Sequence, residues 1–237
     1  MRSSGFRLLL LTWLVASAAL AGTVSFQTAP GATTTYNGTT LPVSAGADFT
    51  LGTTGLSLTL FDYSIDPTSV QQNVSDIYFR VFTASGPYTG PVSIAGLQGT
   101  AVTVSNSGAF TLLPLWSVPA DSWTIAFESG TANTYHLNAL GTGTPNYTVI
   151  GGASDQYHQG SFGTSSHNPF LASGVTFFLD FGQTITGIDS VTFSFGTAPG
   201  ITAPGVSRQT PEPAVLGMTG ASLILVSLVL RRRARRG

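Results

Sequence analysis

The sequence predicts an all-β fold for the central part of the chain, an antiparallel β-sandwich of the jelly-roll type. Apolar residues recur there at every second position, as in 56–60 (Leu-Ser-Leu-Thr-Leu) and 191–195 (Val-Thr-Phe-Ser-Phe). Such alternation places one face of a strand in the core and the other in water. Turn-forming clusters such as 105–108 (Ser-Asn-Ser-Gly) separate these runs, and no segment between 23 and 209 keeps a helical spacing of apolar residues over three turns. Many short strands divided by glycine and proline are typical of antiparallel sandwiches. Further strands are expected at 77–81, 102–104, 123–127 and 175–179.

Residues 1–21 have the three parts of a secretory signal peptide. Arg2 and Arg7 form the positive start, and 8–15 is an apolar stretch interrupted by one threonine. Ala19 and Ala21 then fit the small-x-small pattern at which signal peptidase cleaves, which makes residue 22 the first of the mature protein. An uncleaved membrane helix is the alternative interpretation of this segment.

Charge is scarce and unevenly distributed. Charged residues make up 8% of the chain, against about 25% in a typical soluble domain. All nine basic residues are arginines, and the body between 22 and 210 holds only two of them against nine acidic residues. A nucleic-acid partner is therefore not expected, because binding nucleic acid needs a basic face. The absence of cysteine excludes disulfides, thiolate nucleophiles and cysteine-based metal sites.

The three histidines give no catalytic or metal-binding motif. His136 stands between two apolar residues of an expected strand, so we predict that it faces solvent. His158 and His167 share a polar loop with Asp155, but the chain has no H-x-H or H-E-x-x-H spacing and no G-x-S-x-G turn. We predict no catalytic residue, no bound metal and no cofactor.

Two kinds of binding site remain as alternatives. Asp62, Asp66 and Asp76 lie close together in the sequence and supply oxygen ligands of the kind that calcium prefers, although the calcium loop D-x-D-x-D-G is absent. Exposed aromatic rings offer the second alternative, a face that stacks on sugar rings. The aromatic candidates are Tyr78 and Phe82, which share a strand face with Arg80, and Trp116 and Trp123, which flank a turn with proline.

The C-terminal part of the chain has a different character. Residues 198–210 are rich in proline and small residues and are predicted to form a linker. Pro211, Glu212 and Pro213 follow, then the uncharged apolar run 214–230, then the arginine-rich segment 231–237. As a helix, the 17 residues of 214–230 would reach about 26 Å, the short limit for crossing a membrane. The arginines behind it would remain on the cytoplasmic side and stop transfer.

This order of parts resembles the PEP-CTERM sorting signal of Gram-negative bacteria, over about residues 210–237. The resemblance implies that a membrane-embedded exosortase processes the chain, so that this protein is the substrate and not the enzyme. Pro211, Glu212 and Pro213 would be the recognition residues. The stop-transfer residues would be Arg231, Arg232, Arg233, Arg235 and Arg236. Such tails are also labelled the C-terminal region of ice-binding proteins, which says nothing about whether the remainder binds ice.

The sequence thus predicts a signal peptide (1–21), an exported β-domain (22–197), a linker (198–210) and a sorting segment (211–237). The expected route is export through the inner membrane, transient anchoring by the helix 214–230, and then display at the cell surface or release. The predicted function is that of a non-enzymatic surface or extracellular-matrix protein associated with exopolysaccharide or biofilm. A secreted glycan-binding or glycan-active protein, and an ice-binding or mineral-adsorbing protein, are the alternatives.

Overall fold

A computed structural model describes residues 22–114, 118–119, 121–130, 133–140, 146–158, 160–198 and 200–208. This part of the chain is all-β, as the alternation predicts, with one short 3₁₀ turn, η1 (Val70–Gln72). The strands are β1 (Thr23–Thr28), β2 (Thr33–Tyr36), β3 (Thr39–Pro42), β4 (Ala45–Leu51), β5 (Gly55–Asp62), β6 (Val74–Thr83), β7 (Gly86–Pro87), β8 (Ser93–Val104), β9 (Phe110–Leu112), β10 (Thr124–Glu128), β11 (Thr134–Asn138), β12 (Val149–Ile150), β13 (Phe170–Asp180), β14 (Gly187–Phe195) and β15 (Thr202–Arg208).

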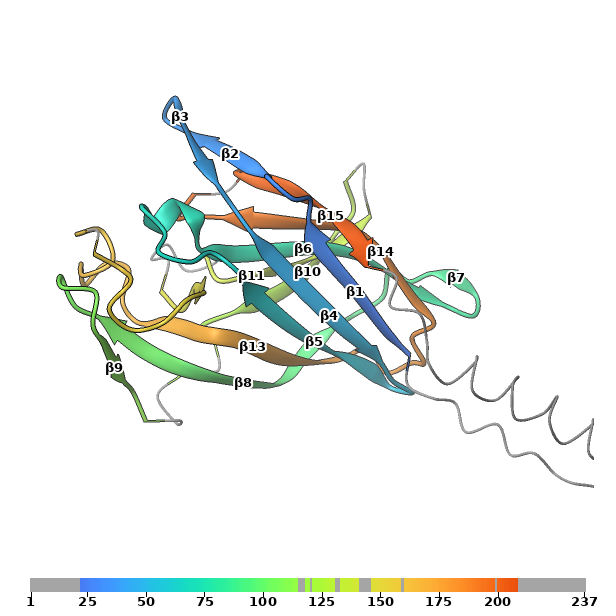
Figure 1. Cartoon of the computed structure of the whole chain (residues 1–237). Coiled ribbons are helices and arrows are strands. Elements are labelled where there is room, and N and C mark those ends of the chain that lie inside the picture. The colour runs from blue at the N-terminus through green and yellow to red at the C-terminus, as the bar shows by residue number, and fades with distance from the viewer. Residues whose placement is uncertain are drawn as a thin grey trace, which may run out of the picture.

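The main sheet closes on itself into a barrel of eight strands (Figure 1). The order around the barrel is β6-β14-β15-β1-β4-β5-β13-β12, and the short strand β12 closes it by pairing in parallel with β13 and antiparallel with β6. Strands β11 and β10 extend the sheet beyond β6, and β8 and β9 extend it beyond β13. The hairpin of β2 and β3 is separate.

The predicted jelly-roll sandwich is therefore wrong in its architecture, although the strand class is right. A sandwich and a barrel both bury one face of each strand, so the alternation of apolar residues is the same in the two folds. Register shifts in β13 and β14 mark the irregularities at which the sheet bends. In β13 the shift lies at Ser173 and Gly174, both of which have a positive φ angle.

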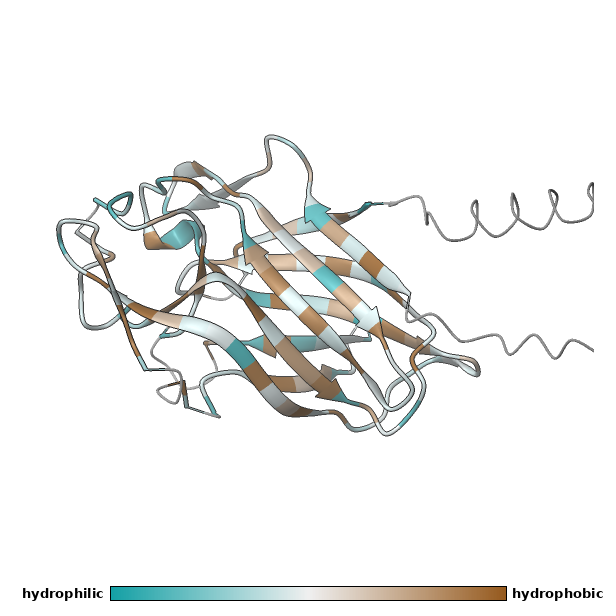
Figure 2. Ribbon diagram, turned by 60° about the horizontal axis from the view of Figure 1, so that its bottom comes forward, coloured by the Kyte–Doolittle hydropathy of each residue, from teal (hydrophilic) through white to brown (hydrophobic). Residues whose placement is uncertain are grey.

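The core lies inside the closed sheet. Along β5, the side chains of Leu56, Leu58 and Leu60 are buried, whereas those of Ser57 and Thr59 on the other face are half-buried. Figure 2 shows the same alternation of apolar and polar residues along the other strands. A smaller cluster around Tyr157, Phe162 and Phe170 fills one end of the molecule.

The linker predicted at 198–210 is contradicted by the structure over most of its length. Residues 202–208 form β15, a strand of the barrel between β14 and β1. The Ala203 side chain is buried, and a side chain on Gly205 would come within 3.1 Å of Val191 and Phe193. Small residues and proline predict a linker because they carry little apolar surface. In the folded protein their small size instead allows β15 to pack closely on the neighbouring strand β14. The β-domain therefore extends to residue 208 and does not end at 197.

The first and last described strands lie side by side. Ser25 of β1 pairs with Arg208 of β15 in antiparallel register, so the chain enters and leaves the barrel at one end. The hairpin of β2 and β3 lies at the opposite end (Figure 1).

Candidate functional site

The predicted sorting residues lie outside the described residues. This holds for Pro211, Glu212, Pro213 and the arginines of 231–237, as it does for Ala19 and Ala21 of the signal peptide. Within the described part of the chain, no helix has the length and apolar character needed to cross a membrane. The tail and the leader therefore stay predictions from the sequence.

The loop with His158, His167 and Asp155 is joined by hydrogen bonds to the turn at 105–108. His158 Nδ1 lies 3.1 Å from the carbonyl oxygen of Ser107, and the N–H of Asp155 donates to the carbonyl of Gly108. Burial lowers the pKa of His167. Among the described residues, no three His, Asp or Glu side chains come close enough together to hold a metal ion.

His136 does not face solvent as predicted. Its side chain is 12% exposed, its Nδ1 lies 2.8 Å from Oε1 of Glu128, and its Nε2 lies 3.9 Å from Oδ1 of the buried Asp76. The ring of Tyr78 stacks on the imidazole with centroids 4.0 Å apart. Burial lowers the pKa of His136, but the carboxylates of Asp76 and Glu128 outweigh it and raise the pKa above its usual value of 6.5.

This cluster predicts a pH-dependent contribution to stability. Because the pKa of His136 is raised in the folded state, the charged imidazole stabilises the fold fully below about pH 6.5, and the effect is lost as pH rises through the higher folded pKa. We expect His136→Gln to lower the melting temperature by roughly 2–4 °C at pH 6 and much less at pH 9. Melting curves of both proteins at the two pH values measure this; an equal loss at both would contradict a charged His136.

The three clustered aspartates do not converge as a calcium site would require. Asp62 is buried at the end of β5, Asp66 is exposed, and Asp76 lies beside His136. The Asp62 carboxylate accepts a hydrogen bond from the N–H of Ser64 at 2.8 Å, and the Ser64 hydroxyl and the Gly151 backbone also hydrogen-bond to it. Burial raises the pKa of Asp62 to about 7.

The aromatic residues singled out in the sequence are engaged within the protein. Tyr78 and Phe82 share the outer face of β6, but Tyr78 stacks on His136, and the Arg80 guanidinium lies 5.7 Å from the Phe82 ring centre. Arg80 also forms a two-point ion pair with Asp189 at 2.8 and 2.9 Å. Trp123 is buried against Phe177 and donates to the carbonyl of Tyr147. Trp116 lies outside the described residues.

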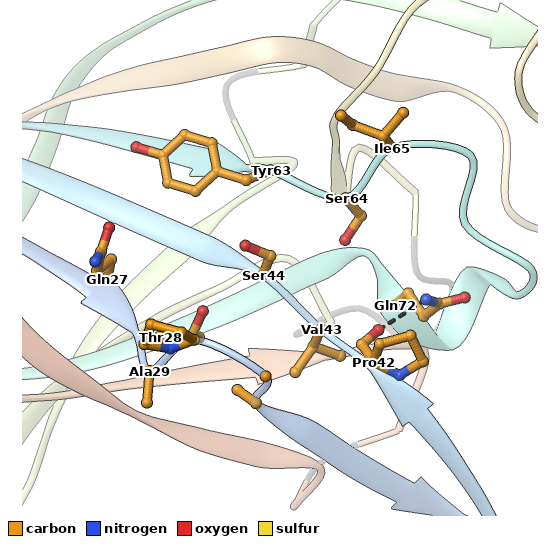
Figure 3. Close-up of a pocket in the computed structure, with 13 residues that line it drawn as sticks. Gln27, Thr28, Ala29, Pro42, Val43, Ser44, Tyr63, Ser64, Ile65 and Gln72 are labelled. Carbon is orange, nitrogen blue, oxygen red and sulfur yellow. Dashed lines mark hydrogen bonds between the residues drawn. The ribbon is translucent and has the colours of Figure 1, made fainter.

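An open hollow of about 490 Å³ lies at the end of the barrel near β2 and β3 (Figure 3). It lies between the end of β1, the start of β4 and the residues that follow β5. Its rim carries two exposed large side chains, Tyr63 at 42% and Ile65 at 76% exposure. Among the described residues, none of those that line the hollow is charged.

Part of the polar lining of this hollow is structural. The Gln72 side-chain oxygen accepts hydrogen bonds from the N–H groups of Thr68 and Ser69, and its amide nitrogen donates to the carbonyl of Pro42 at 2.7 Å. Thr28 Oγ1 accepts from the N–H of Ala45. These bonds join η1 and β1 to the β3–β4 segment and fix the wall of the hollow.

A second set of polar side chains in the hollow is free. The amide of Gln27 and the hydroxyl of Ser44 make no hydrogen bond within the described part of the chain. The buried Ser64 hydroxyl is engaged differently, because it lies beside the Asp62 carboxylate and hydrogen-bonds to it. Ser64 and Ser44 both lie at the hollow (Figure 3). The hollow thus combines a fixed wall with polar groups available to a ligand.

Glycines let two aromatic rings lie flat on the outer face of the sheet beside this hollow. A Cβ on Gly46 of β4 would meet the Tyr63 ring at 2.5 Å, and one on Gly174 of β13 would meet the Phe61 ring at 2.9 Å. The two rings are nearly parallel, 11° apart, with centroids separated by 5.8 Å. Burial raises the pKa of the Tyr63 hydroxyl and Asp48 raises it further, which outweighs the lowering by the neighbouring Arg208, so the phenol is neutral at physiological pH.

Sequence reasoning missed this pair of rings. The alternation that identified β5 was followed only to Leu60, although its next outward positions are Phe61 and Tyr63. The hollow itself had no local signal, because it is assembled from four separate segments of the chain.

A second hollow, of about 520 Å³, lies at the other end of the barrel, along the turn between β4 and β5. It is lined by Phe178, which is 38% exposed, and by Asp180.

Comparisons of the chain with protein-family models, with curated proteins and with solved structures find no match.

Proposed function

We propose that the protein is exported and then processed by an exosortase at its C-terminal segment, and that its barrel acts without enzymatic activity at the cell surface or in the extracellular matrix. The observation that carries the proposal is the order Pro211-Glu212-Pro213, a 17-residue apolar run and five arginines. Each part has a physical role: a helix start, a minimal membrane span, and a charge cluster that lipid does not admit.

The way the barrel is connected supports this arrangement. Because Ser25 pairs with Arg208, the leader and the sorting segment attach to the same end of the barrel. Both membrane segments carry their arginines on the outer side, so both chain termini would lie in the cytoplasm and the barrel on the other side of the membrane.

A glycan-binding role is the second candidate function, and the hollow beside Tyr63 favours it. The hollow presents an aromatic ring and free amide and hydroxyl groups without charge. Stacking on a ring together with hydrogen bonds to hydroxyls is the chemistry by which proteins bind sugars. This role is compatible with an exported matrix protein.

We expect two changes in the tail, Glu212→Ala and deletion of Arg231 to Arg236, to leave unprocessed protein in the inner membrane. The first removes the acidic centre of the recognition tripeptide, and the second removes the stop that holds the segment in place. Immunoblots of fractionated host cells measure precursor and product, with Asp121→Ala, at an exposed position before β10, as the matched control. Release equal to that of the unchanged protein would refute the sorting function.

A further inference from the structure

We propose that the hollow beside Tyr63 binds an uncharged sugar residue of an extracellular polysaccharide. The inference depends on the proposed extracytoplasmic role in one respect only, which is the place where the protein would meet its ligand. Binding by the purified protein and processing in cells are separate measurements, so either proposal can fail without the other.

The absence of charge in the lining selects the class of ligand. The body of the chain carries nine acidic residues against two arginines, yet none of the described residues that line the hollow is charged. An acidic sugar seated in the hollow would find no cation in its lining, because Arg208 lies outside it at the Tyr63 hydroxyl. It would therefore carry a desolvation cost that an uncharged sugar does not have. The amide of Gln27 and the hydroxyl of Ser44 can donate and accept hydrogen bonds, which matches the dual character of sugar hydroxyls.

The Tyr63 ring supplies the apolar part of the site. It lies across Gly46 and keeps 42% exposure, so a face of the ring is open to solvent beside the hollow (Figure 3). The exposed Ile65 side chain stands on the same rim. A volume of about 490 Å³ is within the range of roughly 300–1,000 Å³ that ligand pockets have in proteins.

The position of the hollow suits a polymer met outside the cell. Strand β1 begins beside the point where the chain enters the barrel and ends at Thr28, which lines the hollow. The hollow therefore lies at the opposite end of β1 from the points where the leader and the sorting segment attach.

Affinity electrophoresis tests the proposal. The full-length chain, kept in a detergent without a sugar headgroup, migrates through native gels that contain dextran, laminarin, galactomannan or, as the acidic arm, alginate. We expect at least one of the neutral polysaccharides to retard the protein. Tyr63→Ala should weaken the binding roughly tenfold or more, because it removes the stacking surface, whereas Tyr63→Phe should bind as the wild type does.

Two further variants separate binding from folding. Ser44→Ala removes a hydroxyl that has no hydrogen-bond partner among the described residues, so it should leave the melting temperature unchanged while weakening the binding by roughly 2- to 10-fold. Phe178→Ala, at the other end of the barrel, should bind as the wild type does. The proposal is overturned if no neutral polysaccharide retards the protein or if alginate alone does. It is also overturned if Tyr63→Ala binds as the wild type does, or if Phe178→Ala loses the binding instead.

Discussion

A chain that ends at Thr197 is expected to lose the folded state altogether. It would lack β15, which pairs with β14 along its first half and with β1 along its second half. Without β15 the barrel is open between these two strands, and both present unpaired N–H and C=O groups. A folded domain is stable by only about 5–15 kcal/mol. The loss of the β15 hydrogen bonds, at about 0.5–1.5 kcal/mol each, and the exposure of the core together exceed this stability.

The matched control for this truncation is a chain that ends at Arg208. It keeps β15 and should unfold in a single cooperative transition on heating, followed by circular dichroism, whereas the shorter chain should show none. Both chains lack residues 209–237, so the comparison isolates the eleven residues from 198 to 208. A cooperative transition in the shorter chain would restore the interpretation of this segment as a linker.

Asp62→Asn is expected to stabilise the protein at pH 8 by roughly 2–4 kcal/mol. Burial raises the pKa of Asp62 to about 7, which means that the fold disfavours the charged carboxylate. An amide of the same shape carries no charge and keeps an oxygen to accept the hydrogen bond from Ser64. Each pKa unit corresponds to about 1.4 kcal/mol, and some of the gain is lost because the new amide nitrogen needs an acceptor.

The pH dependence of this gain gives the sharper test. The unfolded carboxyl titrates near 3.8 and the folded one near 7, so wild-type stability falls as pH rises between these values, while the variant does not share the fall. The difference between the two free energies of unfolding should therefore be small at pH 4 and reach its plateau above pH 7. Asp121→Asn, on an exposed residue, is the control. A difference that does not change with pH would show that folding does not raise the pKa of Asp62.

The sequence predicted the strands well because alternation is a local property. Each of the six runs that define the expected strands coincides with or overlaps an observed strand, and Leu58, Phe79 and Phe193 are buried as their positions require. His136 was misassigned for the complementary reason. Its neighbours in the sequence place it on the outer face, but Glu128 from β10 and Asp76 from β6 enclose it there.

The chain by itself determined the strand class, the turns between strands and the charge-poor composition, because these depend on residues near one another in the sequence. The sorting segment is predicted from the sequence alone for the same reason. The tertiary structure decided that the sheet closes into a barrel, that 202–208 completes it, and that Tyr63, Ser44 and Gln27 meet around one hollow. These features depend on pairing between segments far apart in the chain, and alternation specifies which face of a strand is buried but not which strand lies beside it.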